Sequence, residues 1–406
     1  MLGSILLSLL AANAVVAVPL ESSKPPAWIP GPTTGTDELA RNGLSKLEAY
    51  LQTNAGSKNS SCTLKTAHRR KEWDDLVPDQ KKEYIAAVRC LQTLPAISGE
   101  SAPGARSRYD DFVVVHIDGT ASNHTIHNTG VFLSWHRQYI WAFEEALRNE
   151  CNYTGYQPYV KFGRYSNSVI GAPIFDGSET SLSGNGKDVP HGPIPLTAPE
   201  SSPNGVDVEI PALPGGGCVT DGPFVNYTVT LGPRGLASIN DTKPNPLPNG
   251  KGYNPRCMRR SLNVISASGV SDANCTKLIT ESPNIELFQD WMQGPFDFGT
   301  PEYGVHAAAH YMVGGDPGGD FFTSPGDVFF WFLHAEIDRL WWIWQMQDFG
   351  GRVGQIAGTF TPLNFPASRN VTLDDVVDLG GMYGYEAVRI GDIVDTMGGE
   401  FCYIYE

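Results

Sequence analysis

Six of the nine histidines in the chain form two groups of three that lie far apart in the sequence. Neutral imidazole is the commonest metal ligand in proteins, and it suits copper, zinc, iron and nickel. Neither group contains a carboxylate. Two triplets made only of imidazoles point to a pair of copper ions that face each other. The groups are His116, His127 and His136, and His306, His310 and His334.

In the second group, three alanines separate His306 from His310. A spacing of four places both imidazoles on one helical face, one turn apart, and this suits two bonds to a single metal ion. An isolated pair with this spacing is about as often a pair of ordinary core histidines as a pair of metal ligands. His334 lies within a strongly apolar helical segment, where an unpartnered imidazole would cost about 1–3 kcal/mol. A metal ion would be such a partner, although a backbone carbonyl is the alternative.

In the first group, we expect His136 near the start of a long helix and His127 on the loop before it, where Gly130 allows the turn. His116 is expected at the end of a shorter helix. His124 is a rival for the third ligand position. We favour His116 because its neighbours Val113 to Val115 have a buried pattern, whereas His124 lies within a glycosylation motif. The remaining histidines, His68, His124 and His191, are expected at the surface.

The elements that must position these residues follow from the spacing of apolar side chains, which recur every three or four residues in several segments. Pro78 is expected to split one helical segment, since proline favours a helix start. The chain is therefore predicted to be mainly α, with a four-helix core and a loop-rich exterior. Helices are expected at about 37–52, 70–91, 106–119, 130–149, 282–293, 303–312 and 327–346. Long loops with short strands are expected at 166–281, and short strands and turns at 365–406.

The bulk properties restrict the partners and the compartment. A net charge of −15 argues against nucleic acid or an anionic membrane as a partner. Residues 1–17 combine an apolar stretch with small residues before a cleavage-type site, so we expect a signal peptide and secretion. The stretch is too short to span a bilayer. We expect residues 18–406 to form one catalytic domain without a C-terminal shielding domain.

Two further features fit a secretory route. Seven cysteines follow the expected signal peptide, and some of them should form disulfides in an oxidising compartment. Because the number is odd, at least one cysteine is either free or bonded to another chain. The sequence does not give the pairing. Seven N-glycosylation motifs also occur. Their acceptors are Asn59, Asn123, Asn152, Asn226, Asn240, Asn274 and Asn370.

Two longer segments carry a family resemblance. Residues 132–140 read Phe-Leu-Ser-Trp-His-Arg-Gln-Tyr-Ile, with Phe143 and Glu144 shortly after them. Residues 327–341 read Asp-Val-Phe-Phe-Trp-Phe-Leu-His-Ala-Glu-Ile-Asp-Arg-Leu-Trp. They resemble the copper-A and copper-B signatures of the tyrosinase family, in its secreted fungal branch. The resemblance covers about residues 37–406. The Tyr-Gly-Tyr segment at 383–385 resembles the turn that closes the catalytic domain of the family.

The resemblance implies a four-helix bundle that holds two copper ions, copper A on the first histidine group and copper B on the second. It also implies a buried pair between Arg137 and Asp338, and oxidation of phenols or o-diphenols to o-quinones by dioxygen. Fungal relatives act in pigment formation or in aromatic secondary metabolism. The alternative is a dioxygen-binding relative without catalysis. A hydrolytic two-metal site is disfavoured because it needs bridging carboxylates.

Four positions depart from the pattern of the family. Thr125 replaces a cysteine that forms a thioether crosslink in many members, and Leu333 replaces the first histidine of a His-His pair. Lys161 stands where the family has an acid. Ala307 replaces an asparagine that helps to deprotonate monophenols, so diphenol oxidation is favoured over monophenol hydroxylation. We consider Asp297 a possible substitute that holds a water molecule near the site.

Overall fold

The computed structural model describes residues 27–54, 61–122, 125–196, 208–235, 242–294, 304–381 and 386–406. Twelve α-helices lie within these residues, whereas the strands are only two to four residues long. The mainly α fold predicted from the sequence is thus confirmed. Among the described residues, no helix combines the length and the apolar composition needed to cross a bilayer.

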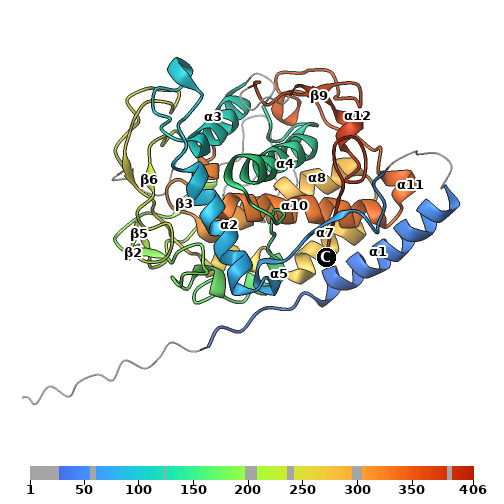
Figure 1. Ribbon diagram of the computed structural model, residues 1–406, viewed down its shortest axis with the longest axis horizontal. Coiled ribbons are helices and arrows are strands. Elements are labelled where there is room, and N and C mark those ends of the chain that lie inside the picture. The colour runs from blue at the N-terminus through green and yellow to red at the C-terminus, as the bar shows by residue number, and fades with distance from the viewer. Residues whose placement is uncertain are drawn as a thin grey trace, which may run out of the picture.

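Four helices carry five of the six predicted metal ligands. The longest two are α4 (Phe132–Cys151) and α10 (Phe329–Met346), which pack against each other across the middle of the molecule (Figure 1). Alongside them lie α3 (Arg108–Ala121) and α9 (Val305–Val313). Every residue of α10 is buried. This is the central helix of the core, and its apolar sequence is what allows it to be covered on all sides.

Local signals in the sequence set where these helices begin and end. Ser107 caps α3 by accepting a hydrogen bond from the backbone N–H of Asp110, and the Asp110 carboxylate accepts from the Ser107 N–H in return. Asn152, in the left-handed conformation, ends α4. Pro78 is the first residue of α2 (Pro78–Leu91), because a proline at this position loses no helical hydrogen bond.

Further helices surround this core. The N-terminal helix α1 (Thr34–Thr53) packs along α10 and α7 (Asp272–Glu281), and α8 (Ile285–Gln293) contacts α9. Figure 1 shows α1 at the opposite side of the molecule from most of the short strands. The remaining helices are single turns or little more. They are α5 (Phe162–Tyr165), α6 (Val264–Ser268), α11 (Phe349–Arg352) and α12 (Ile390–Ile393).

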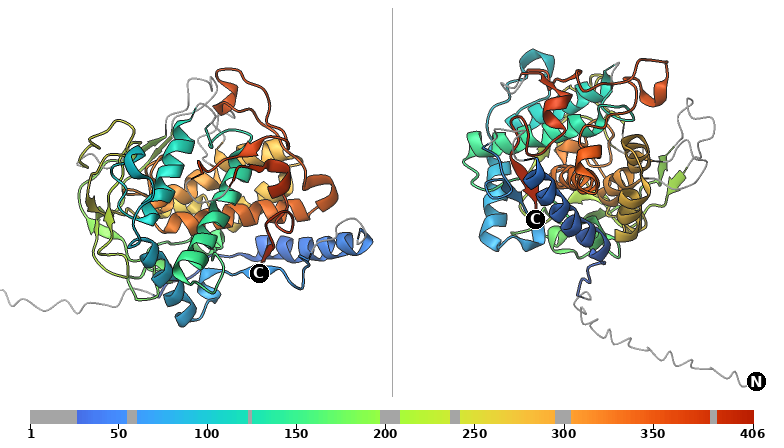
Figure 2. Two further views of the ribbon diagram at one scale, coloured as in Figure 1. Left: turned by 45° about the horizontal axis from the view of Figure 1, so that its top comes forward. Right: turned by 90° about the vertical axis from the view of Figure 1, so that its right-hand side faces the viewer.

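The described strands form five two-stranded ladders. One of them pairs β1 (His68–Arg70) with β10 (Tyr403–Tyr405) in parallel. This pair joins the last residues of the chain to a segment in its first quarter (Figure 2). The others are antiparallel. They are β2 (Gly186–Asp188) with β5 (Gly216–Val219), β3 (Ile194–Leu196) with β4 (Val208–Ile210), β6 (Thr228–Val229) with β7 (Arg256–Cys257), and β8 (Val376–Val377) with β9 (Val388–Arg389).

Three local expectations from the sequence were wrong. The segment 166–281 was expected to hold only loops and short strands, but α6 and α7 begin there, each at a side-chain cap, Asn263 and Ser271. The helical segment expected from residue 70 is divided before Pro78 as predicted, but its first part is only a 3₁₀ turn, Trp73–Asp75, because residues 68–70 pair with the C-terminal strand. His116 lies inside α3 rather than at its end.

All seven cysteines lie within the described residues, and six of them pair. The disulfides are Cys62–Cys402, Cys90–Cys151 and Cys218–Cys257, and the buried Cys275 is free. This confirms that an odd cysteine remains. The Cys62–Cys402 bond closes the longest loop, 340 residues, beside the parallel pair of β1 and β10.

We predict that replacing Cys62 and Cys402 together with serine lowers the free energy of unfolding by about 2–5 kcal/mol, because the unfolded chain gains the freedom of a very long loop. Urea denaturation of the purified variant measures the change. Cys275→Ala is the control, since it removes a thiol but no crosslink. Equal stability of the double variant and the wild type would contradict the prediction.

Candidate metal centre

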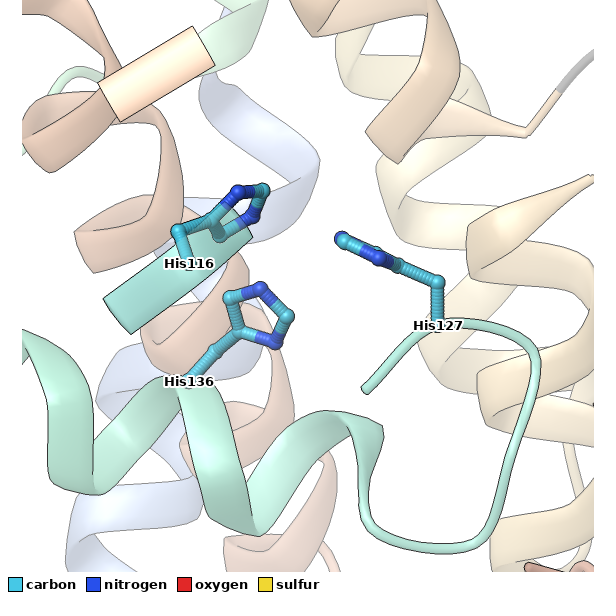
Figure 3. Close-up of side chains that lie close together, drawn as sticks. All are labelled: His116, His127 and His136. Atoms are coloured by element: carbon cyan, nitrogen blue, oxygen red, sulfur yellow. The ribbon is translucent and has the colours of Figure 1, made fainter. Parts of the chain in front are cut away.

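The first histidine group converges in the core from two helices and a loop. His116 extends from α3 and His136 from the second turn of α4, whereas His127 reaches them from the loop between these helices (Figure 3). One nitrogen of each ring lies within 4.8 Å of one nitrogen of both others. The prediction that His127 belongs to the preceding loop and His136 to the start of the helix is confirmed.

Hydrogen bonds to backbone carbonyls fix which ring nitrogen is free in two of these histidines. Nδ1 of His116 lies 2.9 Å from the carbonyl oxygen of Phe322, and Nδ1 of His136 lies 2.8 Å from that of Phe132. A carbonyl can only accept, so Nδ1 carries the proton and Nε2 presents a lone pair. Among the described residues, neither Nε2 atom has a hydrogen-bond partner, although both are buried. Such orientation of an imidazole by its other nitrogen is typical of metal ligands.

The second group is assembled from α9 and α10. Nε2 of His310 lies 3.1 Å from Nε2 of His306 and 3.3 Å from Nε2 of His334. The backbone of Gly318 hydrogen-bonds His310. Three imidazole nitrogens that face one another at this separation are near the spacing expected for ligands about 2.0–2.1 Å from a shared ion.

The two groups lie directly against each other. The rings of His136 and His334, one from each group, stack with their centroids 4.3 Å apart and their planes 8° apart. His127 and His306 face each other at 6.1 Å. Two ions held by these groups would therefore be close neighbours. Phe330 closes one side, because its ring contacts both His116 and His334.

Burial keeps all six imidazoles uncharged. It lowers the pKa of His116 to about 4 and that of His310 to about 3. For the other four histidines the pKa also lies well below its usual value, first because of burial and then because a proton on one ring would repel protons on its neighbours. Neutral imidazole is the ligand form that copper requires. The residues present thus fit two copper ions, with three nitrogens for each.

The residues behind the ligands form a buried charge network. Arg137 follows His136, and its Nε donates to Oδ1 of Asp338 at 2.5 Å; Asp338 lies one turn beyond His334. The second carboxylate oxygen accepts from the hydroxyls of Tyr403 at 2.7 Å and Tyr405 at 2.5 Å. The two half-sites are thereby tied to each other and to the C-terminal strand.

Lys161, which stands where the resemblance would place an acid, is balanced by a different element. Its Nζ lies 3.0 Å from Oδ1 of Asp37 on α1, and Arg339 reaches the same oxygen at 3.4 Å. Arg339 also pairs with Glu336, whose pKa burial raises to about 7. The acid missing at position 161 is thus supplied by α1, and the network behind α10 stays balanced.

A pocket of about 310 Å³ opens over the two histidine groups. His127, His306 and His310 form part of its floor, and Ala307 lies on its wall. Most of the other lining residues were not marked by any pattern in the sequence. Among them are Asn128, Gln293, Tyr311, Asp320 and Phe321.

Two of these lining residues have a defined chemistry. Asp320 is buried, and its carboxylate accepts four backbone N–H bonds, from Arg234, Gly235, Phe322 and Thr323, so it acts as a loop anchor. Phe321 is 46% exposed, and its ring lies 4.6 Å from that of His127. The aromatic ring of a substrate would therefore meet an aromatic neighbour at the mouth of the pocket.

Several predicted residues lie outside the described residues: Asp297, the rival ligand His124, the Tyr-Gly-Tyr turn at 383–385, and the acceptors Asn59, Asn123 and Asn240. Four motif asparagines are described, and all four are exposed: Asn152, Asn226, Asn274 and Asn370. His68 is exposed as expected. His191 is only partly exposed, and its Nε2 lies 2.9 Å from the carbonyl oxygen of Leu213.

We predict that in copper-free protein the six clustered imidazoles stay neutral between pH 7 and pH 5. Unfolded histidines have a pKa of about 6.5, so the unfolded chain binds more protons below that pH. The contribution of these groups to stability therefore falls as the pH drops from about 6.5 toward the value near 4 of folded His116. NMR titration of the ring protons tests this. A midpoint near 6.5 for any of the six would contradict it.

Comparison with known proteins agrees with this geometry. Residues 106–347 match the family described as the common central domain of tyrosinase. The chain is 41% identical over 321 residues to the tyrosinase-like protein orsC of Emericella nidulans, covering 76% of this chain and 82% of that one. It is 37% identical over 357 residues to the N-acetyl-6-hydroxytryptophan oxidase ivoB of the same organism, covering 85% and 94%.

A solved structure is also similar. The polyphenol oxidase of Thermothelomyces thermophila superposes with a TM-score of 0.83 at 38% identity, over 93% of this chain and 98% of that one. With two all-imidazole sites in its core, the chain belongs to the tyrosinase family and is a copper-dependent, tyrosinase-like oxidase.

Proposed function

We propose that the protein oxidises o-diphenols to o-quinones with dioxygen, and that its substrate is a small aromatic metabolite. The observation that carries the proposal is the pocket, which places ligand histidines of both groups at the floor of one opening. A volume of about 310 Å³ is at the lower end of the range for small-molecule sites, which is roughly 300–1,000 Å³. It suits a substrate with one or two rings.

The charge of the pocket favours a neutral substrate. The one carboxylate among its described lining residues, Asp320, is fully occupied by backbone N–H groups. Burial, followed by the nearby Asp320 carboxylate, raises the pKa of the adjacent Tyr311 to about 12, so its hydroxyl stays protonated and can hydrogen-bond a phenol. A neutral phenol needs no countercharge here.

Each part of the site has a separate task in this reaction. Two copper ions, when bound to the histidines, supply the two-electron oxidation of the substrate by dioxygen. Phe321 and Tyr311 would orient the ring of the substrate. The aromatic shell around His116 and His334 excludes water, and the backbone carbonyls hold the proton on Nδ1 of His116 and His136.

Ala307 makes diphenols the better substrate class. Its methyl group lies on the pocket wall and cannot hold a water molecule that would remove the proton of a monophenol. An o-diphenol is the easier substrate because it needs no hydroxylation. A relative is named for a hydroxylated tryptophan derivative. We therefore place the substrate of this chain among aromatic secondary metabolites or pigment precursors.

We also propose that the protein is secreted and glycosylated. The apolar N-terminal segment and seven glycosylation motifs support this. The three disulfides fit an oxidising compartment.

The ligand assignment is tested with His334→Ala. We predict that this variant retains about one copper per chain and has no oxidase activity on a panel of phenols and o-diphenols, because two nitrogens alone do not complete the second site. Copper content and oxygen consumption are measured together. His68→Ala, which changes an exposed ring, is the control and should behave as wild type. Turnover by the His334→Ala variant would contradict the assignment.

Ala307→Asn tests the basis of substrate choice. We predict that it raises kcat/KM for monophenols relative to diphenols by roughly fivefold, since one added hydrogen bond is worth about 1 kcal/mol. Ala307→Val has a similar change in bulk without the amide, and it should not raise this ratio. An equal gain in both variants would show that the size of the side chain, rather than its amide, sets the preference.

A further inference from the structure

A series of oxidisable aromatic side chains begins at the ligands of the first histidine group. The indole of Trp135 lies 4.9 Å from the ring of His136, and the phenol of Tyr139 lies 4.6 Å from that indole. Both are buried on α4. Neither is among the residues that line the substrate pocket, so a substrate would not contact them there.

The series continues through the core to α10 and α3. The ring of Trp331 is 4.9 Å from Tyr139, and that of Tyr109 is 6.4 Å from Trp331. The indole N–H of Trp331 donates to the Tyr109 hydroxyl at 3.2 Å. All of these rings are buried. Electron transfer between aromatic groups weakens steeply with distance, and each step here is between near neighbours.

The series ends at Tyr227, whose ring lies 5.7 Å from that of Tyr109. Tyr227 is partly exposed and lines a second pocket of about 400 Å³, which shares no lining residue with the pocket over the histidines. Its hydroxyl donates to Oδ1 of Asp110 at 3.3 Å. An oxidisable phenol at the surface is therefore joined to a carboxylate that can take its proton.

We propose that these five residues form an electron relay that protects the metal centre when no phenol occupies the substrate pocket. Tyr227 gives one electron, which passes through Tyr109, Trp331, Tyr139 and Trp135 and reduces the oxidised centre by one electron. The phenolic proton of Tyr227 goes to Asp110. The neutral tyrosyl radical left at the surface is reduced by an enediol or thiol reductant, which supplies one electron and one proton, and Asp110 then releases its proton to solvent.

The groups that accept hydrogen bonds from the three tyrosine hydroxyls explain why the radical forms at Tyr227. The hydroxyls of Tyr139 and Tyr109 donate to the backbone carbonyls of Phe112 and Pro325, at 2.5 and 2.7 Å. A carbonyl of this kind does not take up a proton, so oxidation of these two phenols is not accompanied by proton loss. Asp110 differs because it is a carboxylate, and burial raises its pKa.

A second group of aromatic side chains behind the site is less suited to this role. Tyr403 and Tyr405 both bond Asp338, but the guanidinium of Arg70 lies 3.7 Å from the ring centroid of Tyr403. Arg137 covers the ring of Trp341 at the same distance. A nearby positive charge disfavours removal of an electron from an aromatic ring. Within the described part of the chain, no guanidinium covers the ring of Tyr109 or Tyr227 in this way, although Arg260 and Arg256 are near enough to act on these two phenols.

The relay is tested by trapping the radical rather than by measuring turnover. Copper-loaded protein is treated with hydrogen peroxide in the absence of phenol, together with a nitroso spin trap, and tryptic peptides are mapped by mass spectrometry. We expect the adduct at Tyr227. Tyr227→Phe should lose it, and Tyr253→Phe should keep it, because Tyr253 lines the same pocket but is 46% exposed and has no ring contact with Tyr109 among those found.

Two further samples separate the relay from simple surface oxidation. Tyr109→Phe, which keeps the ring but removes the oxidisable hydroxyl, should abolish the adduct at Tyr227 while copper content stays at the wild-type level. Copper-free wild type should give no adduct. An adduct of equal yield without copper, with Tyr109→Phe, or located at Tyr403 instead of Tyr227, would overturn the proposal. These readouts do not depend on which phenol is the substrate.

Discussion

The constraint on which this structure depends is that six uncharged imidazoles must keep bare nitrogen lone pairs facing one another in a dry interior. In the first group this leaves the buried Nε2 atoms of His116 and His136 without a hydrogen-bond partner in the described chain, which costs free energy. Burial makes the protonated forms still less favourable. Metal ions would give these nitrogens partners, and the surrounding fold must hold the nitrogens in place.

The fold meets this demand by fixing the ligands from behind. Arg137 and Asp338 each follow a ligand histidine on a different helix, and their ion pair holds α4 and α10 in register where the two groups meet. Breaking one member of a buried pair of this kind typically costs about 3–5 kcal/mol, because the other charge is left without a partner. Tyr403 and Tyr405 extend this network to the C-terminal strand, so the end of the chain contributes to the geometry of the centre.

The sequence predicted the six clustered histidines and missed most of the other residues that line the pocket. The spacing of His306 and His310 and the apolar setting of His334 are local signals, and the structure brings these residues together as expected. Asp320 and Phe321 enter the pocket on the loop that follows α9, and Tyr311 lies on α9 itself, but no short-range pattern in the sequence marks any of the three as a pocket residue. Likewise, Lys161 could be interpreted only after Asp37 was found opposite it, 124 positions earlier in the chain.

This division has a chemical consequence. The six histidines, five on helices and His127 on a loop, carry what dioxygen chemistry requires, namely three neutral nitrogens for each ion, and these requirements are the same whatever phenol is oxidised. Other residues around the pocket carry what distinguishes one phenol from another: the small Ala307 side chain and the hydroxyl of Tyr311 on α9, and the aromatic face of Phe321 on the loop after it. None of these three is among the six histidines, so each can be replaced without loss of a ligand nitrogen. Substrate choice in this chain can therefore change while the metal centre, and the buried charges that support it, remain as they are.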